Sequence, residues 1–282
     1  MSGRKPIPET SVDSFVAQSL GKLREFILAA DPPISDQLLE ALEKDARSGA
    51  RKLASEIRKR RLIDLMEKQR LDGLFRFENA LAVQGYKLIA GVDEAGMAPL
   101  AGPVIAAAAI LPDNYRLPGL DDSKKITDEP KRDALASEIK KNAVCWSTGR
   151  AEVEEIDRMN IYRAGLLAMR RAVCGLNPKP DFALVDARNI PGCPCPQKGI
   201  IHGDALCASI AAASLIAKTT RDAYMIEQDR IYPGYGFAAH KGYPTLEHLR
   251  ALKKLGPLAI HRKSFAPVRE ALGVQPVQNR LF

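Results

Sequence analysis

The chain has 282 residues, of which 46% are hydrophobic, so it can form a sizeable core and is not disordered throughout. Its 42 Lys and Arg side chains exceed its 34 Asp and Glu side chains, and the net charge of +8 favours a polyanionic partner. No apolar run approaches the roughly 20 residues of a membrane helix. The length predicts one or two domains. Five cysteines, an odd and sparse number, and the lack of an apolar stretch near the N-terminus predict a cytoplasmic protein.

The positive charge is concentrated near the end of the chain. Residues 218–282 carry 11 basic and five acidic side chains, whereas residues 87–217 carry 16 of each. The basic segment favours contact with nucleic acid, and a solvated basic surface is the alternative.

The first 85 residues are predicted to be helical. Leu20, Leu23 and Ile27 recur at helical spacing, and Ser35 can cap a second helix. A long polar helix is expected over residues 52–82. Its flank is strongly basic and would be either a solvated face or a phosphate-binding patch: Arg47, Arg51, Lys52, Arg58, Lys59, Arg60 and Arg61.

After Gly85 the sequence changes to strands followed by helices, which predicts an α/β domain. The apolar runs 87–93, 103–111 and 181–186 predict buried strands, and residues 152–173 and 205–225 have helical spacing. We expect three parts: a helical extension over 1–85, an α/β domain over 86–225 and a C-terminal segment of helices and loops over 226–282.

Acidic residues follow the ends of the predicted strands. Asp93 and Glu94 close the first, Asp186 closes another, and Asp204 opens a helix. Carboxylates gathered at one sheet edge repel one another unless cations lie between them, and hard oxygen ligands favour Mg²⁺ or Mn²⁺. Two such ions can activate water and stabilise a leaving oxygen in phosphodiester cleavage. Taken singly, each acid has a structural alternative, such as a helix cap for Asp204.

A series of motifs in this region resembles type 2 ribonuclease H, the bacterial ribonuclease HII family. The resemblance covers about residues 86–267 in order. Its motifs are Gly91-Val-Asp-Glu-Ala-Gly96, Pro99-Leu-Ala-Gly-Pro103, Asp122-Ser-Lys-Lys-Ile126, Glu155-Ile-Asp-Arg-Met-Asn-Ile161, Leu184-Val-Asp186, Gly203-Asp204, Ser209-Ile-Ala-Ala-Ala-Ser214, Ala217-Lys218, Thr220-Arg-Asp222, Tyr232-Pro-Gly-Tyr-Gly-Phe237, His240-Lys-Gly-Tyr243 and Ile260-His-Arg-Lys-Ser-Phe-Ala-Pro267. The leader is similar to the N-terminal extension of some bacterial members.

The resemblance implies an RNase H-like fold, a mixed central sheet flanked by helices, with a helical N-terminal extension and a helical C-terminal segment. It implies cleavage of RNA paired to DNA and incision 5′ to ribonucleotides embedded in duplex DNA, leaving 3′-hydroxyl and 5′-phosphate ends. It makes Asp93, Glu94, Asp186 and Asp204 the catalytic, metal-binding acids for two Mg²⁺ or Mn²⁺ ions. Asp93 and Asp204 would hold one ion, and Asp93, Glu94 and Asp186 the other.

The resemblance also implies substrate contacts. Tyr243 matches a tyrosine that stacks on the deoxyribose after the ribonucleotide; the alternative is a loop aromatic packed on the core. Phosphate contacts are expected from Lys124, Lys125, Lys218 and Arg221, with solvated side chains as the alternative. Asp222 falls at a further acidic position, where a helix-surface or structural role is equally open.

One tripeptide departs from the family pattern. The family normally has Gly-Arg-Gly, which grips the 2′-hydroxyl and the adjacent phosphate, where this chain has Gly96-Met97-Ala98. Met97 has no guanidinium, and Ala98 does not easily adopt a positive φ. The hypothesis is a metal-dependent nuclease with altered recognition of a single embedded ribonucleotide.

Partners and alternatives follow from the same comparison. We expect a monomer whose partners are hybrid and ribonucleotide-containing duplexes, with no membrane. The tail Gln275-Pro-Val-Gln-Asn-Arg-Leu-Phe282 loosely resembles a sliding-clamp-binding peptide, and a frayed terminus is the alternative. Ribonuclease HIII and a non-catalytic hybrid-binding relative are the competing assignments. Cys193-Pro-Cys195 is read as a loop with reduced thiols.

Overall fold

The structure is a computed structural model that describes residues 17–29, 34–113 and 115–274. The chain divides into two compact units, residues 1–69 and residues 70–282. The three-part division expected from the sequence remains a prediction. In the described part of the chain, no helix is long and apolar enough to cross a membrane.

The first unit consists of α2 (Leu20–Ala29), α3 (Asp36–Lys44) and most of α4 (Ser48–Leu74). Ser35 caps α3 by accepting a hydrogen bond from the amide of Leu38, as expected. A small core joins the three helices: Leu23, Ile34, Leu38, Leu39, Leu42, Ala50, Leu53, Ala54 and Ile57.

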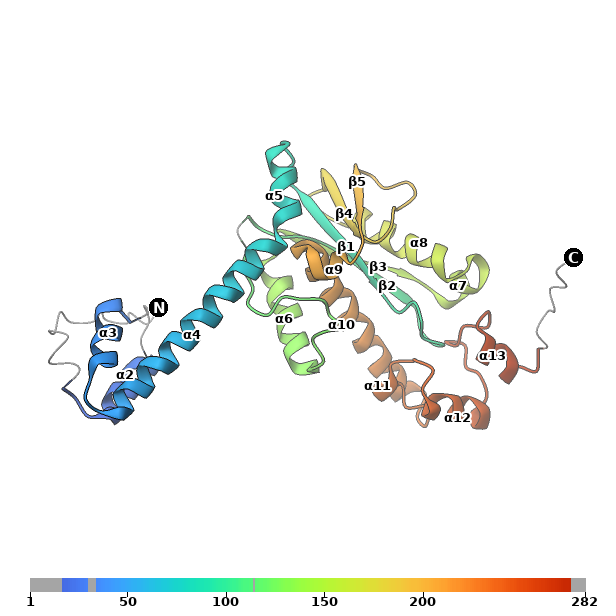
Figure 1. The fold of residues 1–282 in the computed structure, drawn as a ribbon. Helices are drawn as coiled ribbons and strands as arrows, with labels where there is room; N and C mark the ends of the chain where they lie inside the picture. The colour runs from blue at the N-terminus through green and yellow to red at the C-terminus, as the bar shows by residue number, and fades with distance from the viewer. Residues whose placement is uncertain (1–16, 30–33, 114, 275–282) are drawn as a thin grey trace, which may run out of the picture. The chain divides into compact units, whose positions relative to one another are not determined.

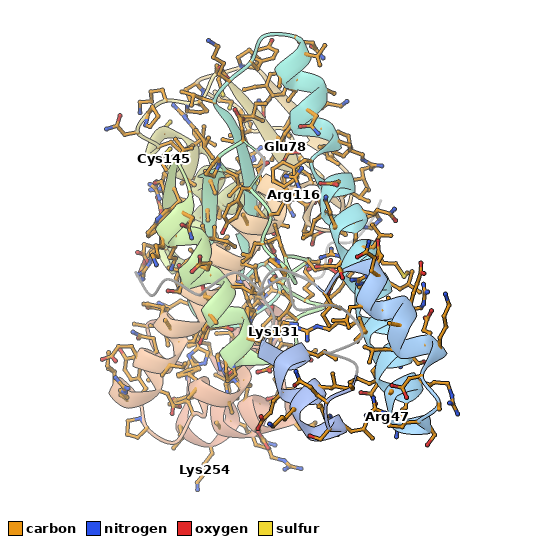
Figure 2. All side chains as sticks on the ribbon, turned by 90° about the vertical axis from the view of Figure 1, so that its left-hand side faces the viewer. Arg47, Glu78, Arg116, Lys131, Cys145 and Lys254 are labelled. Atoms are coloured by element: carbon orange, nitrogen blue, oxygen red, sulfur yellow. The ribbon has the colours of Figure 1, made fainter. Side chains whose placement is uncertain are left out.

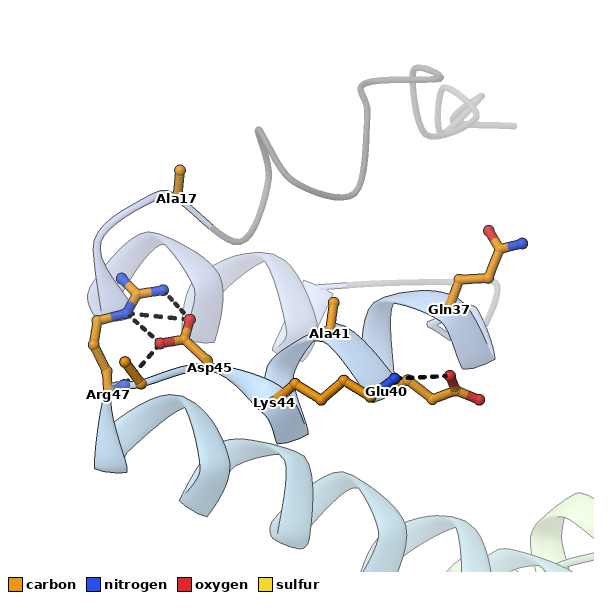
Figure 3. Close-up of a pocket in the computed structure, with 8 residues that line it drawn as sticks. Ala17, Gln37, Glu40, Ala41, Lys44, Asp45 and Arg47 are labelled. Atoms are coloured by element: carbon orange, nitrogen blue, oxygen red, sulfur yellow. Dashed lines mark hydrogen bonds and ion pairs between the residues drawn. The ribbon is translucent and has the colours of Figure 1, made fainter.

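The basic flank of the first unit is partly neutralised within that unit. Arg47 forms an ion pair with Asp45 and Arg58 with Glu43. A hollow of about 780 Å³ lies beside α3 and is lined by residues between Ala17 and Arg47 (Figure 3). Because its lining includes none of the four predicted acids, this hollow is not the predicted catalytic site.

The long helix expected over 52–82 is two helices in the structure. It breaks at Phe75, between α4 and α5 (Arg76–Val83). The Phe75 side chain is buried in the core of the second unit. Burial of its ring offsets the loss of regular helix at this residue.

A five-stranded mixed sheet forms the centre of the second unit, with strand order β3-β2-β1-β4-β5 (Figure 1). β1 pairs antiparallel with β2 and parallel with β4. The strands are β1 (Ile89–Ala95), β2 (Val104–Ile110), β3 (Cys145–Ala151), β4 (Phe182–Asp186) and β5 (Gln197–Ile200).

Helices cover both faces of this sheet. One face packs on α8 (Ile161–Cys174), and the other on α10 (Ala208–Ile231) with α6 (Glu129–Asn142) beside it (Figure 1). Close approach depends on two glycines. A Cβ on Gly91 would lie 2.0 Å from the Ser209 carbonyl carbon, and one on Gly149 would lie 2.1 Å from the Ala168 carbonyl oxygen. The buried alanines of β2 likewise let the helices lie near the strands.

Shorter helices complete the second unit. The helical stretch expected over 152–173 is α7 (Val153–Met159) and α8, separated at Asn160, whose φ is +73°. The chain then continues from α9 (Gly203–Leu206) and α10 into α11 (Phe237–His240), α12 (Leu246–Leu255) and α13 (Ala266–Ala271). Lys254, at the end of α12, points into solvent (Figure 2). The α/β fold with a helical C-terminal segment is therefore confirmed.

α5 is fixed to the sheet domain by one carboxylate. Glu78 on α5 (Figure 2) accepts hydrogen bonds at Oε1 from the Ser209 amide and the Ser209 hydroxyl, both at 2.8 Å. These bonds satisfy the first turn of α10 with an acid from another helix.

Candidate active site

Adjacent parallel strands bring the first and third acids together. β1 and β4 run in parallel with Val92 opposite Val185, so Asp93 and Asp186 are the next residues of neighbouring strands. Asp93 and Glu94 lie inside β1, which extends to Ala95, and do not follow its end as the sequence suggested. Because side chains alternate along a strand, these two carboxylates leave opposite faces of β1.

The fourth acid joins this sheet edge through a short helix. Asp186 Oδ1 accepts a hydrogen bond of 2.8 Å from the amide of Gly203, the first residue of α9. Asp204 is the next residue. Burial raises the pKa of Asp186, and the nearby charge of Asp204 raises it further. The four acids thus form one cluster, defined by Asp93, Glu94, Asp186 and Asp204.

Burial and mutual repulsion raise the pKa values within the cluster. Burial is the largest cause for Asp93, which is 4% exposed, and the charges of Glu94 and Asp186 add to it. Burial also raises the pKa of Glu94 to about 7, although Arg188 acts in the opposite direction. Asp93, Glu94 and Asp186 are therefore held in a place where a nearby cation would be strongly favoured.

Two basic side chains neutralise the cluster. Lys124 Nζ donates to Asp204 Oδ2 at 2.9 Å, and Arg188 Nη2 lies 3.1 Å from Glu94 Oε1. Among the described residues, no three His, Cys, Asp or Glu side chains are arranged around a common point to hold a metal ion.

The donor atoms of the cluster nevertheless fit a hard divalent cation. All are carboxylate oxygens, and Glu94 Oε2 is buried without a hydrogen-bond partner among the described residues. An unpartnered carboxylate oxygen in a buried site is costly unless a cation or donor reaches it. The residues present are thus those that would hold Mg²⁺ or Mn²⁺.

Met97 packs inward, while Ala98 is exposed. Gly96 has a φ of +97°, and a Cβ there would lie 2.2 Å from Arg221 Nε, so this position requires glycine. Ala98 is not among the residues with positive φ, so the strain anticipated from its methyl group is absent.

Arg262 fixes the backbone of the tripeptide Gly96-Met97-Ala98 through hydrogen bonds to its carbonyl groups. It is fully buried and donates to the carbonyls of Gly96 at 2.6 Å, Met97 at 3.2 Å and Gly102 at 2.9 Å. Sequence reasoning placed this arginine in a motif without giving it a role. Its function depends on contacts some 160 residues away in the chain, which no local pattern reveals.

Arg221, for which the resemblance implied a phosphate contact, lies in the interior of the protein, and that contact stays a prediction. Its side chain is 1% exposed, and it donates to the carbonyls of Pro103, Ala101 and Lys241. Buried backbone oxygens require donors, and Arg221 provides them. Its role is to hold the glycine loop, with Arg262, and to join that loop to the segment before Tyr243.

Three further residues singled out from the sequence, Lys125, Lys218 and Asp222, form ion pairs in the structure. Lys218 and Arg132 both pair with Asp222, at 2.7 Å and 3.3 Å, and Asp222 is 6% exposed. Asp222 is therefore part of a buried ion-pair network and not a helix-surface residue. Lys125 pairs with Asp121 at the surface.

Tyr243 is partly exposed and lies on a segment fixed by buried histidines. Its ring centroid is 6.0 Å from Lys218 Nζ, and its exposed fraction is 39%. The Leu258 amide donates to His261 Nδ1, so His261 Nε2 carries the proton and donates to His248 Nε2 at 3.0 Å. His248 Nδ1 then donates to the carbonyl of Tyr243 at 2.9 Å.

Comparison with known proteins decides the family. The family model described as Ribonuclease HII matches residues 90–268, and the one described as Ribonuclease HII N-terminal domain matches residues 23–82. The chain belongs to the ribonuclease HII family. It is 61% identical over 264 residues to ribonuclease HII of Myxococcus xanthus, covering 94% of this chain and 90% of that protein.

Solved structures of the ribonuclease H2 group share the fold. The ribonuclease H2 of Pyrococcus horikoshii is 25% identical, with a TM-score of 0.56 over 66% of this chain and 97% of that one. The Archaeoglobus fulgidus ribonuclease HII, solved as a complex with PCNA, is 24% identical, with a TM-score of 0.55 over 64% and 96%. The predictions of an RNase H-like fold and of a ribonuclease H enzyme acting on RNA–DNA hybrids are thus confirmed.

Proposed function

We propose that the four-acid cluster is the catalytic centre of a metal-dependent endoribonuclease, which also incises 5′ to ribonucleotides embedded in duplex DNA. The observation that carries this proposal is the convergence of Asp93, Glu94, Asp186 and Asp204, with an unpartnered oxygen on Glu94. When bound, Mg²⁺ or Mn²⁺ supplies the positive charge that activates water and offsets charge on the leaving 3′-oxygen.

The chain's own residues would position the substrate. Asp186 is oriented by the Gly203 amide, and Lys124 offsets the charge of Asp204. Tyr243 is partly exposed beside Lys218, a position consistent with stacking on a sugar. These contacts would align the scissile phosphate with the acids, which is the positional part of catalysis.

The proposal includes altered selectivity for a single embedded ribonucleotide. Arg262 fixes the backbone of Gly96 and Met97, so main-chain recognition of the ribose can persist. Met97 supplies no charge, because its thioether is neutral, and its side chain packs beside Gly165 of α8. Backbone recognition without a guanidinium from this loop would reduce the preference for one ribonucleotide over a long hybrid.

Two substrates test this proposal: a duplex DNA with one ribonucleotide and a long RNA–DNA hybrid, each with Mg²⁺ or Mn²⁺. We expect cleavage of both, with little preference for the single ribonucleotide. The double variant Met97→Arg, Ala98→Gly should raise single-ribonucleotide cleavage relative to the hybrid. A strong single-ribonucleotide preference in the unaltered chain would refute altered selectivity, and no cleavage of either substrate would refute the catalytic assignment.

Three further features belong to the proposal. A clamp contact by residues 275–282 is proposed because the tail resembles a clamp-binding peptide and the Archaeoglobus protein of like fold was solved with PCNA. The tail lies outside the described residues. We propose also that the enzyme acts as a monomer in the cytoplasm.

A further inference from the structure

Arg188 lies two residues after the third acid, Asp186, and its side chain reaches the acid cluster at Glu94. Ala187, between Asp186 and Arg188, has a φ of +48°, a left-handed conformation that is unfavourable for a residue other than glycine. The Ala187 amide donates to Ile200 on β5, and a Cβ on Gly199 would lie 2.8 Å from the Arg188 carbonyl oxygen. The turn after β4 is thus tightly packed around this residue.

The guanidinium has one ionic partner and one unused donor. Nη2 lies 3.1 Å from Glu94 Oε1, whereas Nη1 is buried without a hydrogen-bond partner among the described residues. The side chain is only 20% exposed, so water cannot fully replace a missing acceptor. An arginine with an unused buried donor is incomplete as a purely structural group.

α8 provides a support for this guanidinium. Arg188 Cζ lies 5.2 Å from the centroid of the ring of Tyr162, a residue of α8. A Cβ on Gly165 would come within 3.1 Å of Arg188 Nη1 and 3.0 Å of Met97 Sδ, so the glycine leaves room for both side chains. Arg188 therefore brings a positive charge to the side of the glycine loop where Met97 has none.

We propose that Arg188 is a substrate-binding residue whose guanidinium contacts a backbone phosphate of the cleaved duplex. The inference rests on the proposed function, because Glu94 must turn to a cation for Arg188 to lose the carboxylate with which it pairs among the described residues. A guanidinium left without an acceptor in a buried site is unfavourable, and a phosphate matches its planar fork. Substrate phosphate would supply acceptors for Nη1 and Nη2 together.

Hybrid binding as a function of salt tests this assignment. The measurements use Asp186→Asn protein with Mg²⁺, which is expected to bind without cutting, and compare it with Asp186→Asn, Arg188→Met. Loss of one phosphate contact should weaken binding about 10-fold. It should also make the plot of log association constant against log salt concentration less steep, reducing the magnitude of its negative slope by roughly 0.9. Asp186→Asn, Arg188→Lys should recover part of the slope but not the full affinity, since Lys has no fork.

Lys179→Met in the same background is the charge-matched control. Lys179 is exposed and precedes β4, whereas the acids lie at the far end of that strand, roughly 16 Å away for five residues. It should leave affinity and slope unchanged. Equal slopes for the Arg188→Met and Lys179→Met proteins would overturn the assignment of Arg188. Failure of the Asp186→Asn protein itself to bind hybrid would instead count against the proposed function.

Discussion

Lys124 donates a hydrogen bond to Asp204 at 2.9 Å, and the accepting carboxylate is only 8% exposed. Lys125, the next residue, makes an ion pair of 3.0 Å with Asp121, whose side chain is 29% exposed. Similar distances therefore occur in two different environments. Both lysines are exposed, at 76% for Lys124 and 56% for Lys125, so the environments differ at the carboxylate. A buried carboxylate left without its cation is costly, whereas a surface pair contributes little.

This contrast predicts different effects of removing each lysine. Without divalent ions at pH 8, Lys124→Met should lower the free energy of unfolding by about 1–3 kcal/mol, because Asp204 is left buried without a partner. Millimolar Mg²⁺ should restore most of that loss. Lys125→Met should change stability by less than about 0.5 kcal/mol. Urea unfolding with and without Mg²⁺ measures both, and equal effects for the two variants would contradict the charged cluster.

Asp93→Asn should stabilise the metal-free protein while abolishing activity. Burial raises the pKa of Asp93, so folding favours its neutral form. The stability of the folded protein therefore falls as the pH rises from the ordinary pKa of an aspartate through the raised pKa of Asp93. At pH 8 the variant should be more stable than the unaltered chain by about 1–3 kcal/mol. The gain should shrink in acid, where Asp93 is protonated.

Thermal unfolding in chelator-containing buffer across pH 5–8 measures this difference. Asp113→Asn is the control, because Asp113 is exposed and should show no such trend. A destabilised Asp93→Asn protein at pH 8 would show that Asp93 is not under electrostatic strain.

The buried histidines predict acid sensitivity. Burial lowers the pKa of His261 to about 4 and also lowers that of His248. Both therefore fold in the neutral form, and the stability they contribute is present above about pH 6.5 and lost as pH falls towards 4. His261→Gln should cost about 1–3 kcal/mol at pH 7.5 and flatten this acid dependence.

Urea unfolding at pH 7.5 and pH 5 checks the prediction. His202→Asn is the control, since His202 is exposed in the left-handed region that asparagine tolerates. An unchanged pH dependence in His261→Gln would rule out the relay from His261 to Tyr243 as its source.

Arg262→Lys should damage the glycine loop despite conserving charge. Lysine cannot reach the three carbonyls of Gly96, Met97 and Gly102 together, so at least one remains buried without a donor. We expect a loss of about 2–4 kcal/mol in stability and a larger loss in kcat/KM than the unfolded fraction explains. Activity measured well below Tm separates the two effects, and full activity there would contradict a positioning role.

The sequence was informative where hydrophobic patterns are strong. β1, β2 and β4 are apolar runs buried on both faces, so their positions were predictable from the residues alone. β3 was missed because Trp146, Ser147 and Thr148 alternate on a partly exposed edge strand. β5 was missed because four residues give no usable period.

The acids of the site were predictable, but their counter-ions were not. Asp93, Glu94 and Asp186 stand at or near the ends of clear strands, whereas Arg188 and Arg262 act through partners far away in the sequence. The burial of Arg221 could not be predicted, because an arginine in a helix has the same sequence pattern whether it faces solvent or a buried carbonyl. Only tertiary contacts distinguish these cases.

Single-turnover cleavage of a long RNA–DNA hybrid by the unaltered chain and by Asp186→Asn is the most direct test of the catalytic cluster. We predict Mg²⁺- or Mn²⁺-dependent cleavage of the RNA strand to 3′-hydroxyl and 5′-phosphate ends, abolished by chelator. Asp186→Asn should fold normally by circular dichroism and cleave at least about 10³-fold more slowly, because one oxygen charge at the cation site is lost. Cleavage within tenfold of the unaltered rate, or cleavage that persists in chelator, would contradict the assignment.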